Sequence, residues 1–492
     1  MKTYQHMIGN EWRDPASGAW IDSIEPFSGE VWARVPRGNA QDAELAIEAA
    51  HRAFVSPAWA GLSASSRGAL LRKLAALIER DAEALGAIEQ RSNGKLIVEV
   101  AGQMRHAAQW VHYYAGLADK VGGRVVPMPK PGIFGYTRRE PLGVVLAITP
   151  WNSPFALTIW KLAPALAAGN TIVIKPSEFT SASIFELARL CIEAGFPPGV
   201  VNVVSGYGAE IGEPLANHPR VAKIAFTGGE HGGRSVNVAA AQRFKRVTLE
   251  LGGKSANIVF EDADIEQAVK GAIAGIFSAA GQTCMAGSRL LLQDTIHDRF
   301  VERLVEEAGK ARIGDPSDPG TQVGPISNRP HFEKVLSYID IAKNEGATCV
   351  LGGKALSGPG YGQGQFIAPT IFTNVTNSMR IAREEVFGPV LSVIKFADMD
   401  EALEIANDTD YGLAGAVWTR DLHRALHCVE RIQAGTVWVN NYRTTSFATP
   451  FGGYKHSGLG REGGVEAIEE YLQTKSVWIT TQPNRENPFV LG

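Results

Sequence analysis

The feature that most constrains the fold of this chain is a regular alternation of short apolar segments with amphipathic segments between residues 142 and 251. The apolar segments lie at 142–149, 171–175, 200–205, 221–227 and 246–251. Strands that are apolar throughout and alternate with helices are typical of a parallel sheet covered on both faces. The pattern therefore predicts a doubly wound α/β domain, which binds ligands at the carboxyl ends of its strands.

A second alternation follows the first. We expect strands at 256–260, 288–293, 390–396, 414–418 and 436–440, with helices over 264–280 and 294–310. With 492 residues, the chain is long enough for two α/β domains that need no disulfide or metal to hold their cores. The segment 122–137, rich in Gly, Pro and Val, is predicted to be an extended excursion, and 475–480 one more strand.

Charge and cysteine content exclude several classes of protein. The 48 basic and 51 acidic residues give a net charge of −3, which argues against nonspecific binding of nucleic acid. The cysteines lie far apart in the chain and form no Cys-x-x-Cys motif, so we expect neither a disulfide scaffold nor a metal site. They are Cys191, Cys284, Cys349 and Cys428.

The sequence also predicts where the protein resides. The N-terminus carries no apolar stretch of signal-peptide type, and no run approaches the roughly 20 apolar residues of a membrane span. Few cysteines fit a reducing compartment. We therefore expect a cytoplasmic protein with no membrane partner.

Glycines and charged residues follow the predicted strands of the first domain. Gly208, Gly228 and Gly229 stand where backbone N–H groups could approach a phosphate, or they only close tight turns. Lys175 and Glu178 follow the second strand, where they could hold ribose hydroxyls or remain solvated. These alternatives stay open on spacing alone.

Three further residues carry reactive chemistry. Cys284, after an apolar helix, could be a nucleophilic thiolate, although a lone cysteine in an α/β protein is usually buried and inert. Glu250, between leucines at a strand end, could be a general base or could bind the amides of the glycine turn after it. Asn152 could donate to an oxyanion or could simply belong to a turn.

The order and context of these signals are more specific than any one of them, and the chain resembles the NAD(P)-dependent aldehyde dehydrogenase family over essentially its whole length. The matching stretches are ITPWN at 148–152, KPSE at 175–178, FTG at 226–228, LELGGK at 249–254, GQTC at 281–284, EEVFGP at 384–389 and PFGGYK at 450–455.

The resemblance implies a role for each matching residue. Cys284 matches the nucleophile, Asn152 the side-chain oxyanion donor and Glu250 the base that activates water. Lys175 and Glu178 match the pair that holds the adenosine ribose. The complete expected cofactor site is Thr149, Trp151, Lys175, Ser177, Glu178, Gly208, Phe226, Gly228, Gly229, Leu251, Glu385 and Phe387.

The reaction implied is NAD-dependent oxidation of an aldehyde to a carboxylic acid. A cysteine thiohemiacetal loses hydride to give a thioester, which water then hydrolyses. Glu250 favours this hydrolytic branch over the alternative, an acylating enzyme that releases its product to coenzyme A. The other alternative is a non-catalytic, crystallin-like member of the family, against which the intact Cys284, Glu250 and Asn152 argue.

One departure from the family pattern concerns the phosphate site. In the family a serine usually follows the FTG motif, whereas here Gly229 stands at that position. The next residue, Glu230, adds a negative charge close to the expected phosphate. Glu178 is expected to repel a 2′-phosphate, which favours NAD over NADP.

The substrate is the part of the function that the sequence defines least. The residues expected to line its funnel are Arg105, Gln109, Phe155, Met285, Arg443 and Phe451. Arginines bind carboxylates through two hydrogen bonds, which favours a semialdehyde acid, unless Arg105 and Arg443 are surface residues paired with acids. Aromatic residues in the same loop suit an aromatic or heterocyclic aldehyde equally well.

The family resemblance also implies a domain division. We expect an NAD-binding domain at 1–117 and 141–251, and a catalytic domain at 252–442 that continues to about 470 before returning to the first domain. The segments 118–140 and 471–492 are expected to form an oligomerisation element. A pair of exposed strands is an aggregation hazard in a monomer, so a dimer or tetramer is predicted.

Overall fold

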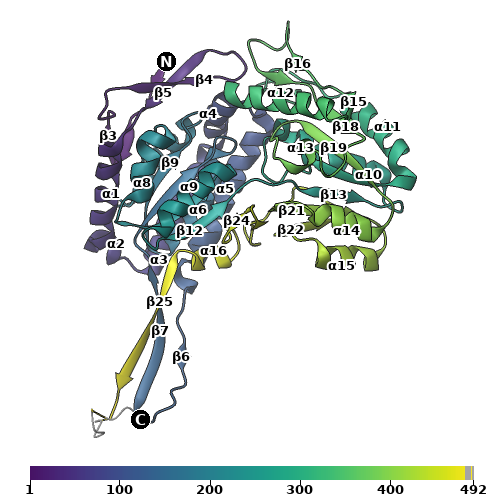
Figure 1. Cartoon of the computed structure of the whole chain (residues 1–492). Helices are drawn as coiled ribbons and strands as arrows, with labels where there is room; N and C mark the ends of the chain where they lie inside the picture. Colours follow the sequence, from purple (N-terminus) through teal and green to yellow (C-terminus); the bar gives the residue numbers. More distant parts are fainter. Residues whose placement is uncertain (483–488, 490–492) are drawn as a thin grey trace.

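The computed structural model describes residues 1–482 and 489, and two α/β bodies and a projecting arm account for most of its elements (Figure 1). The last residues of the predicted oligomerisation element, 483–488 and 490–492, lie outside the described part. In Figure 1 the first body is drawn in purple to teal and the second in green.

The first body is built on an eight-stranded sheet in the order β24-β12-β11-β8-β9-β10-β2-β3. The predicted strands are present as β8 (Val144–Thr149), β9 (Thr171–Pro176), β10 (Val201–Val203), β11 (Val221–Thr227) and β12 (Arg246–Glu250). These five pair in parallel, and their side chains are largely excluded from solvent. Short antiparallel strands form the edges, namely β2 (His6–Ile8), β3 (Glu11–Arg13) and β24 (Gly458–Leu459).

Helices cover both faces of this sheet in one or two layers. Those that pack directly on its strands are α1 (Ala40–Val55), α6 (Pro154–Ala167), α7 (Ala182–Ala194), α8 (Glu213–Asn217) and α9 (Glu230–Ala241). The others, which pack mainly on these helices and on one another, are α2 (Pro57–Ala60), α3 (Ala64–Arg80), α4 (Ala82–Asn93) and α5 (Ile97–Leu117). A small sheet of β1 (Lys2–Thr3), β5 (Val31–Pro36) and β4 (Trp20–Ile24) adjoins them. The chain order reverses at β8, because β9 and β10 lie on one side of it and β11 and β12 on the other. Such a reversal opens a crevice at the carboxyl ends of the strands.

The second body contains a seven-stranded sheet, in the order β15-β18-β19-β14-β13-β21-β22. Its strands are β13 (Ala256–Val259), β14 (Arg289–Gln293), β15 (Thr348–Leu351), β18 (Thr370–Thr373), β19 (Val390–Phe396), β21 (Ala414–Trp418) and β22 (Thr436–Val439). Its helices are α10 (Ile265–Phe277), α11 (His297–Ala308), α12 (Arg329–Asn344), α13 (Arg380–Arg383), α14 (Met399–Asn407) and α15 (Leu422–Arg431). All pairings are parallel except that of β15.

The arm consists of three antiparallel strands, β6 (Val125–Val126), β7 (Ile133–Pro141) and β25 (Leu472–Thr480). It extends away from the first body (Figure 1), and α16 (Glu466–Glu469) precedes its last strand. The predicted excursion at 122–137 and the C-terminal strand therefore belong to one element.

The helix predicted over 264–280 is wrong at its end. Helix α10 stops at Phe277, and Ala279, Ala280 and Gly281 all take left-handed backbone angles. Gly281 has no substitute there, because a Cβ would lie 2.0 Å from the carbonyl oxygen of Gly388. This reversal turns the chain toward the first body just before Cys284.

Candidate active site

A cavity of about 160 Å³ lies where the two bodies meet. Strands β8, β11 and β12 reach it with their carboxyl ends, while the second body contributes the segments that lead into β14 and β19. The residues that line it are Pro150, Trp151, Asn152, Leu157, Thr227, Gly228, Gly229, Glu250, Leu251, Gly252, Cys284, His331, Lys334, Glu385 and Phe387. The structure thus brings all three predicted catalytic residues into one cavity.

Cys284 lies in the turn between the left-handed segment and β14, and its side chain is half-buried. Burial and the nearby carboxyls of Glu250 and Glu385 raise the pKa of the thiol to about 12. Hydrogen bonds from the backbone N–H groups of Met285 and Cys284 lower this pKa, but by less. The cysteine alone is therefore a thiol near neutral pH, and a positive charge at the site would be needed to stabilise the thiolate.

Asn152 follows β8 and is buried, with 7% of its surface exposed. Its side-chain amide donates a hydrogen bond of 2.9 Å to the carbonyl oxygen of Gln282, two residues before the thiol. One of the two N–H bonds of the amide remains for a second acceptor, so Asn152 is placed to donate to an oxyanion formed at Cys284.

Glu250 ends β12 and is almost completely buried, yet neither carboxyl oxygen has a hydrogen-bond partner among the described residues. Burial and the charge of Glu462 raise its pKa well above the ordinary value, and Lys161 and Arg461 only partly oppose this. Lys161 itself donates to Thr227 Oγ1 over 2.6 Å and pairs with Glu462. An unpartnered carboxyl with a raised pKa is suited to act as a general base near neutrality.

The turn between β11 and α9 lines the cavity with backbone groups suited to a phosphate. Helix α9 begins beyond Gly229, whose position leaves open space for a ligand, and no side chain caps the helix. A Cβ on Gly228 would lie 2.6 Å from the Phe226 ring, so a larger residue would require this ring to shift. Free N–H groups at a helix N-terminus bind phosphate.

The residues predicted to hold the adenosine ribose lie at the ends of the neighbouring strands β9 and β10. Lys175, at the end of β9, is buried, and its Nζ lies 3.8 Å from a carboxyl oxygen of Glu178. Ser177 donates to Glu178 over 3.5 Å. Gly208 begins a short π-helical turn beyond β10, and Thr149 accepts a hydrogen bond from Thr158. These residues lie outside the cavity but at the same end of the sheet, so the chain fits a dinucleotide.

Glu230, the departure from the family pattern, is paired with neighbouring side chains. Its carboxylate accepts hydrogen bonds from Arg234 over 3.1 Å and from Tyr411 over 3.3 Å, and it lies 3.3 Å from His456. These partners lower its pKa and neutralise much of the charge. Gly229 therefore keeps its backbone free for phosphate beside an acidic residue.

The cavity also contains residues that the sequence did not indicate, namely Leu157 of α6 and, on the first turns of α12, His331 and Lys334. His331 hydrogen-bonds the carbonyl oxygen of Phe387 over 2.6 Å and packs 4.9 Å from the Trp151 ring. Phe387 has a left-handed φ of 61°, which this contact holds in place. Burial lowers the pKa of His331 to about 4, so it is neutral. The only signal in the sequence is the helix start at 329.

Glu385, one of the residues predicted to bind the cofactor, lines the cavity. One of its carboxyl oxygens accepts a 3.0 Å hydrogen bond from the backbone N–H of Gly253. A Cβ on Gly252 would lie 2.3 Å from the other oxygen, so a larger residue there would displace this carboxylate.

The predicted substrate residues divide into two groups. Phe155 and Phe451 are buried, Met285 is half-buried beside Cys284, and Arg443 is half-buried in the loop after β22. An aromatic wall completes this side, in which Phe447 packs against His106, Trp110 and Tyr113, and Phe451 against Trp160.

Arg105 and Gln109 are placed differently. Both are exposed on the outer face of α5, and Arg105 pairs with the exposed Glu83. For Arg105 the structure therefore agrees with the alternative of a surface arginine paired with an acid, because the buried face of α5 presents Trp110 instead.

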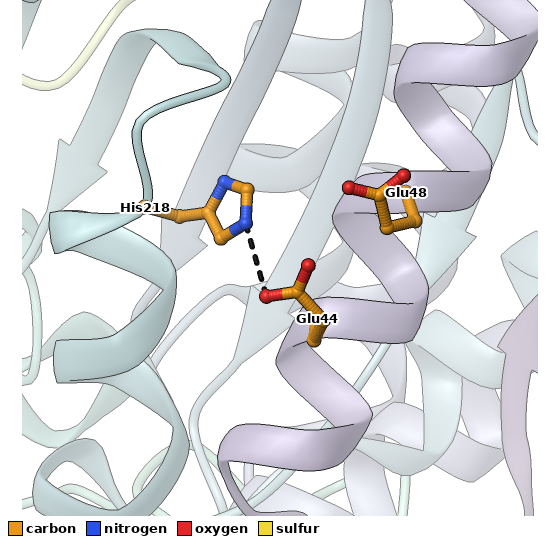
Figure 2. Close-up of side chains that lie close together, drawn as sticks. All are labelled: Glu44, Glu48 and His218. Atoms are coloured by element: carbon orange, nitrogen blue, oxygen red, sulfur yellow. Dashed lines mark hydrogen bonds and ion pairs between the residues drawn. The ribbon is translucent and has the colours of Figure 1, made fainter.

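One group of possible metal ligands occurs elsewhere in the described chain. Figure 2 shows Glu44, Glu48 and His218, whose ligand atoms all lie within 4.8 Å of one another. His218 already hydrogen-bonds Glu44 over 3.1 Å and accepts from the Arg220 backbone, while Glu48 pairs with the Arg220 side chain. These partners account for the group without an ion. Among the described residues, none of the helices combines the length and the apolar character that a membrane-spanning helix needs.

The fold and the site together are typical of a dinucleotide-dependent oxidoreductase that works through a thiol. The family model described as "Aldehyde dehydrogenase family" matches residues 12–477. The chain belongs to the aldehyde dehydrogenase family, and the predicted family, fold class and class of enzyme are confirmed.

Individual relatives match over nearly the full length. The chain is 45% identical over 495 residues to (Z)-2-((N-methylformamido)methylene)-5-hydroxybutyrolactone dehydrogenase of Acinetobacter baylyi, covering 100% of both chains. It is 45% identical to betaine aldehyde dehydrogenase of Bacillus subtilis, covering 98% of both.

A solved structure extends the comparison to three dimensions. Betaine aldehyde dehydrogenase from Staphylococcus aureus in complex with NAD+ is similar, with a TM-score of 0.97 and 42% identity, over 99% of this chain and 97% of that one. The cofactor in that structure is the one that the sequence predicts here.

Proposed function

We propose that the protein oxidises an aldehyde to a carboxylic acid with NAD+ by the hydrolytic route. The observation that carries this proposal is the convergence of Cys284, Asn152 and Glu250 on one cavity at the carboxyl ends of β8, β11 and β12. The mechanism follows from what each of these residues can hold or transfer.

Cys284 forms the covalent bond to the substrate. Its thiolate sulfur attacks the carbonyl carbon, and the resulting oxyanion accepts hydrogen bonds from the Asn152 side chain and the Cys284 backbone N–H. When bound, NAD+ supplies the hydride acceptor and a positive charge beside the thiol. Collapse of the oxyanion re-forms the carbonyl group as the hydride leaves, and the acyl group remains on Cys284 as a thioester.

Glu250 completes the turnover. Its carboxylate takes a proton from water, whose oxygen attacks the thioester carbon, and the C–S bond then breaks to release the acid and the thiolate. Each turnover converts one aldehyde, one NAD+ and one water into one carboxylate, one NADH and two protons. A carboxyl with a raised pKa is well matched to this transfer.

An assay of NADH formation with a panel of aldehydes tests this function. NADH and free acid without added coenzyme A are expected. A rate that requires coenzyme A and yields an acyl thioester would identify the acylating alternative. Absence of turnover in folded protein that binds NAD+ would favour the crystallin-like one.

For the substrate, we propose an aldehyde with an anionic group at its far end. Arg443 makes no ion pair with any described residue, and its guanidinium donates to the carbonyl oxygen of Ala274 over 3.1 Å. Burial lowers its pKa, while the charges of Glu99, Tyr442 and Cys284 act in the opposite direction. A half-buried guanidinium near the nucleophile favours a carboxylate and disfavours a cationic aldehyde.

The aromatic wall supports the second substrate class, an aromatic or heterocyclic aldehyde, and one variant separates the two. In Arg443→Met, KM for semialdehyde acids is expected to rise at least tenfold, with KM for benzaldehyde unchanged. An equal change for both substrates would remove the argument for an anionic substrate. Arg105→Met is the matched control, because its exposed ion pair is expected to have no effect on either KM.

We further propose the domain division stated above and self-association through the arm into a dimer or tetramer. The arm exposes large apolar residues, namely Trp478 and Ile479 on β25 and Val125 on β6. A second copy that covered them would remove this surface from water. The four unpaired cysteines fit a cytoplasmic location.

A further inference from the structure

The turn that presents Asn152 is held from behind by the end of helix α4. Helix α6 begins at Pro154, and the side chain of Ser153 does not cap it. Instead, the backbone N–H of Phe155 donates over 3.2 Å to Glu89 of α4. The carbonyl oxygen of Asn152 accepts a 3.3 Å hydrogen bond from the side-chain amide of Asn93, the last residue of α4.

Lys95 completes this attachment. Its Nζ donates to Ser153 Oγ and to Gln103 Oε1, the latter over 3.2 Å. Its backbone N–H donates over 3.0 Å to the side-chain oxygen of Asn93. The Asn93 side chain therefore links Lys95 on one side to Asn152 on the other, and both Asn93 and Lys95 are buried.

The local backbone explains this arrangement. Gly94 ends α4 with a left-handed φ of 77°, which reverses the chain and places residues 93 and 95 on the same side of the turn. A Cβ on Gly94 would lie 2.9 Å from the ring of Pro325, so the reversal is packed as well as hydrogen-bonded.

The consequence for Asn152 is that it is fixed at both ends. Asn93 binds its backbone oxygen, and the carbonyl oxygen of Gln282 accepts from its side-chain amide. An oxyanion donor is effective only when it is already aimed at the place where charge develops, and a displacement of about 1 Å is costly. We propose that Asn93 and Lys95 are positioning residues that hold the Asn152 amide in its donating geometry.

This inference rests on the proposed function, because it assigns Asn152 to the oxyanion. Asn93 and Lys95 do not line the cavity, so neither contacts the substrate, although Lys95 is close enough to Cys284 for their charges to interact. Their loss is therefore expected to lower kcat and to leave KM and the Kd of NAD+ nearly unchanged.

The test uses Asn93→Ala and Lys95→Met in the full-length protein. We expect kcat to fall about ten- to a hundredfold in each, with KM and the Kd of NAD+ within twofold of the parent. Lys95→Arg retains a cation that can reach Ser153 and is expected to recover most of the rate. Ser92→Ala is the matched control, since it removes a buried hydrogen bond of 2.8 Å at the same helix end, but one made to Ile88 of α4 itself.

A double-mutant cycle with Asn152→Ala decides between positioning and a general structural effect. If Asn93 acts through Asn152, Asn93→Ala is expected to change kcat less than twofold when Asn152 is already alanine. The same loss in both backgrounds, or no loss in the parent, would overturn the proposal. Lys95→Met is carried through the same cycle in case Asn93→Ala does not fold.

The proposed function is tested separately within this cycle. Asn152→Ala alone is expected to lower kcat about 10²- to 10³-fold. An unchanged kcat in that variant would refute the oxyanion role itself, whatever Asn93 does.

Discussion

Replacing Glu250 by glutamine separates the two halves of the proposed reaction. The carboxyl makes no hydrogen bond with the described residues, so the isosteric amide breaks no contact. It removes only the ability to take a proton from water. General-base catalysis is typically worth about 10²- to 10⁴-fold, so steady-state kcat is expected to fall by that factor while thioester formation continues.

The same variant is expected to be less active but more stable than the parent protein at neutral and alkaline pH. Because the pKa of Glu250 is higher in the folded protein than in the unfolded chain, ionisation at rising pH costs folding free energy, about 1.4 kcal/mol for each pH unit by which the pKa is raised. Below the ordinary pKa of a glutamate this cost is absent. The glutamine variant is therefore expected to be the more stable protein at pH 8 and of equal stability near pH 4.

Rapid mixing of enzyme, NAD+ and aldehyde measures the first effect. The variant is expected to release about one NADH per active site in a fast burst, followed by the slow steady rate, and acid quenching is expected to trap the acyl group on Cys284. Cys284→Ser is the control and should abolish the burst. A slow reaction without a burst would place Glu250 before the thioester, and an unchanged steady rate would refute its role as the base.

Four further predictions follow from single contacts. Because the pKa of Cys284 is about 12, the rate at which iodoacetamide alkylates this residue should rise tenfold per pH unit between pH 7 and 9. Added NAD+ should move this pH profile to lower pH. A rate that reaches a plateau below pH 9 without NAD+ would contradict the assigned cause. Gly281→Ala should cost about 2 kcal/mol or more of unfolding free energy in a urea titration, since its Cβ meets Gly388 and its φ is positive. Glu178→Ser should raise the ratio of kcat/KM for NADP to that for NAD at least tenfold, and an unchanged ratio would show that another group selects the cofactor. Trp478→Glu on the arm should shift the protein to a smaller species in size-exclusion chromatography at unchanged far-UV circular dichroism.

Much of the fold could be predicted because its signals are local. Strands β8 and β9 are largely apolar runs, and the predicted bounds of β8, β9, β11 and β12 lie within a residue or two of the observed ones. The end of α10 was not predicted correctly, because Ala279 and Ala280 favour helix. The left-handed turn is required only by the contact of Gly281 with Gly388, more than a hundred residues later in the chain.

The candidate site shows the same division. Cys284, Asn152 and Glu250 could be named from motifs, since each stands in a distinctive local sequence. His331 could not, because its position in the cavity depends on the packing of α12 against Trp151 and Phe387. The sequence predicts the same substrate-binding role for Arg105 and Arg443. Only the fold separates them, because it places Arg105 on the outer face of α5 and Arg443 near the nucleophile.

The sequence by itself determined the family, the two alternations of strand and helix, and the identity of the groups that would react. The tertiary structure decided the environment of those groups: which carboxyl is buried beside Glu462, which amide is fixed between Asn93 and Gln282, and where the charge of Glu230 is neutralised. The physical reason is that apolar periodicity acts over a few neighbouring residues. A pKa or the aim of a hydrogen bond depends instead on atoms that only folding brings together.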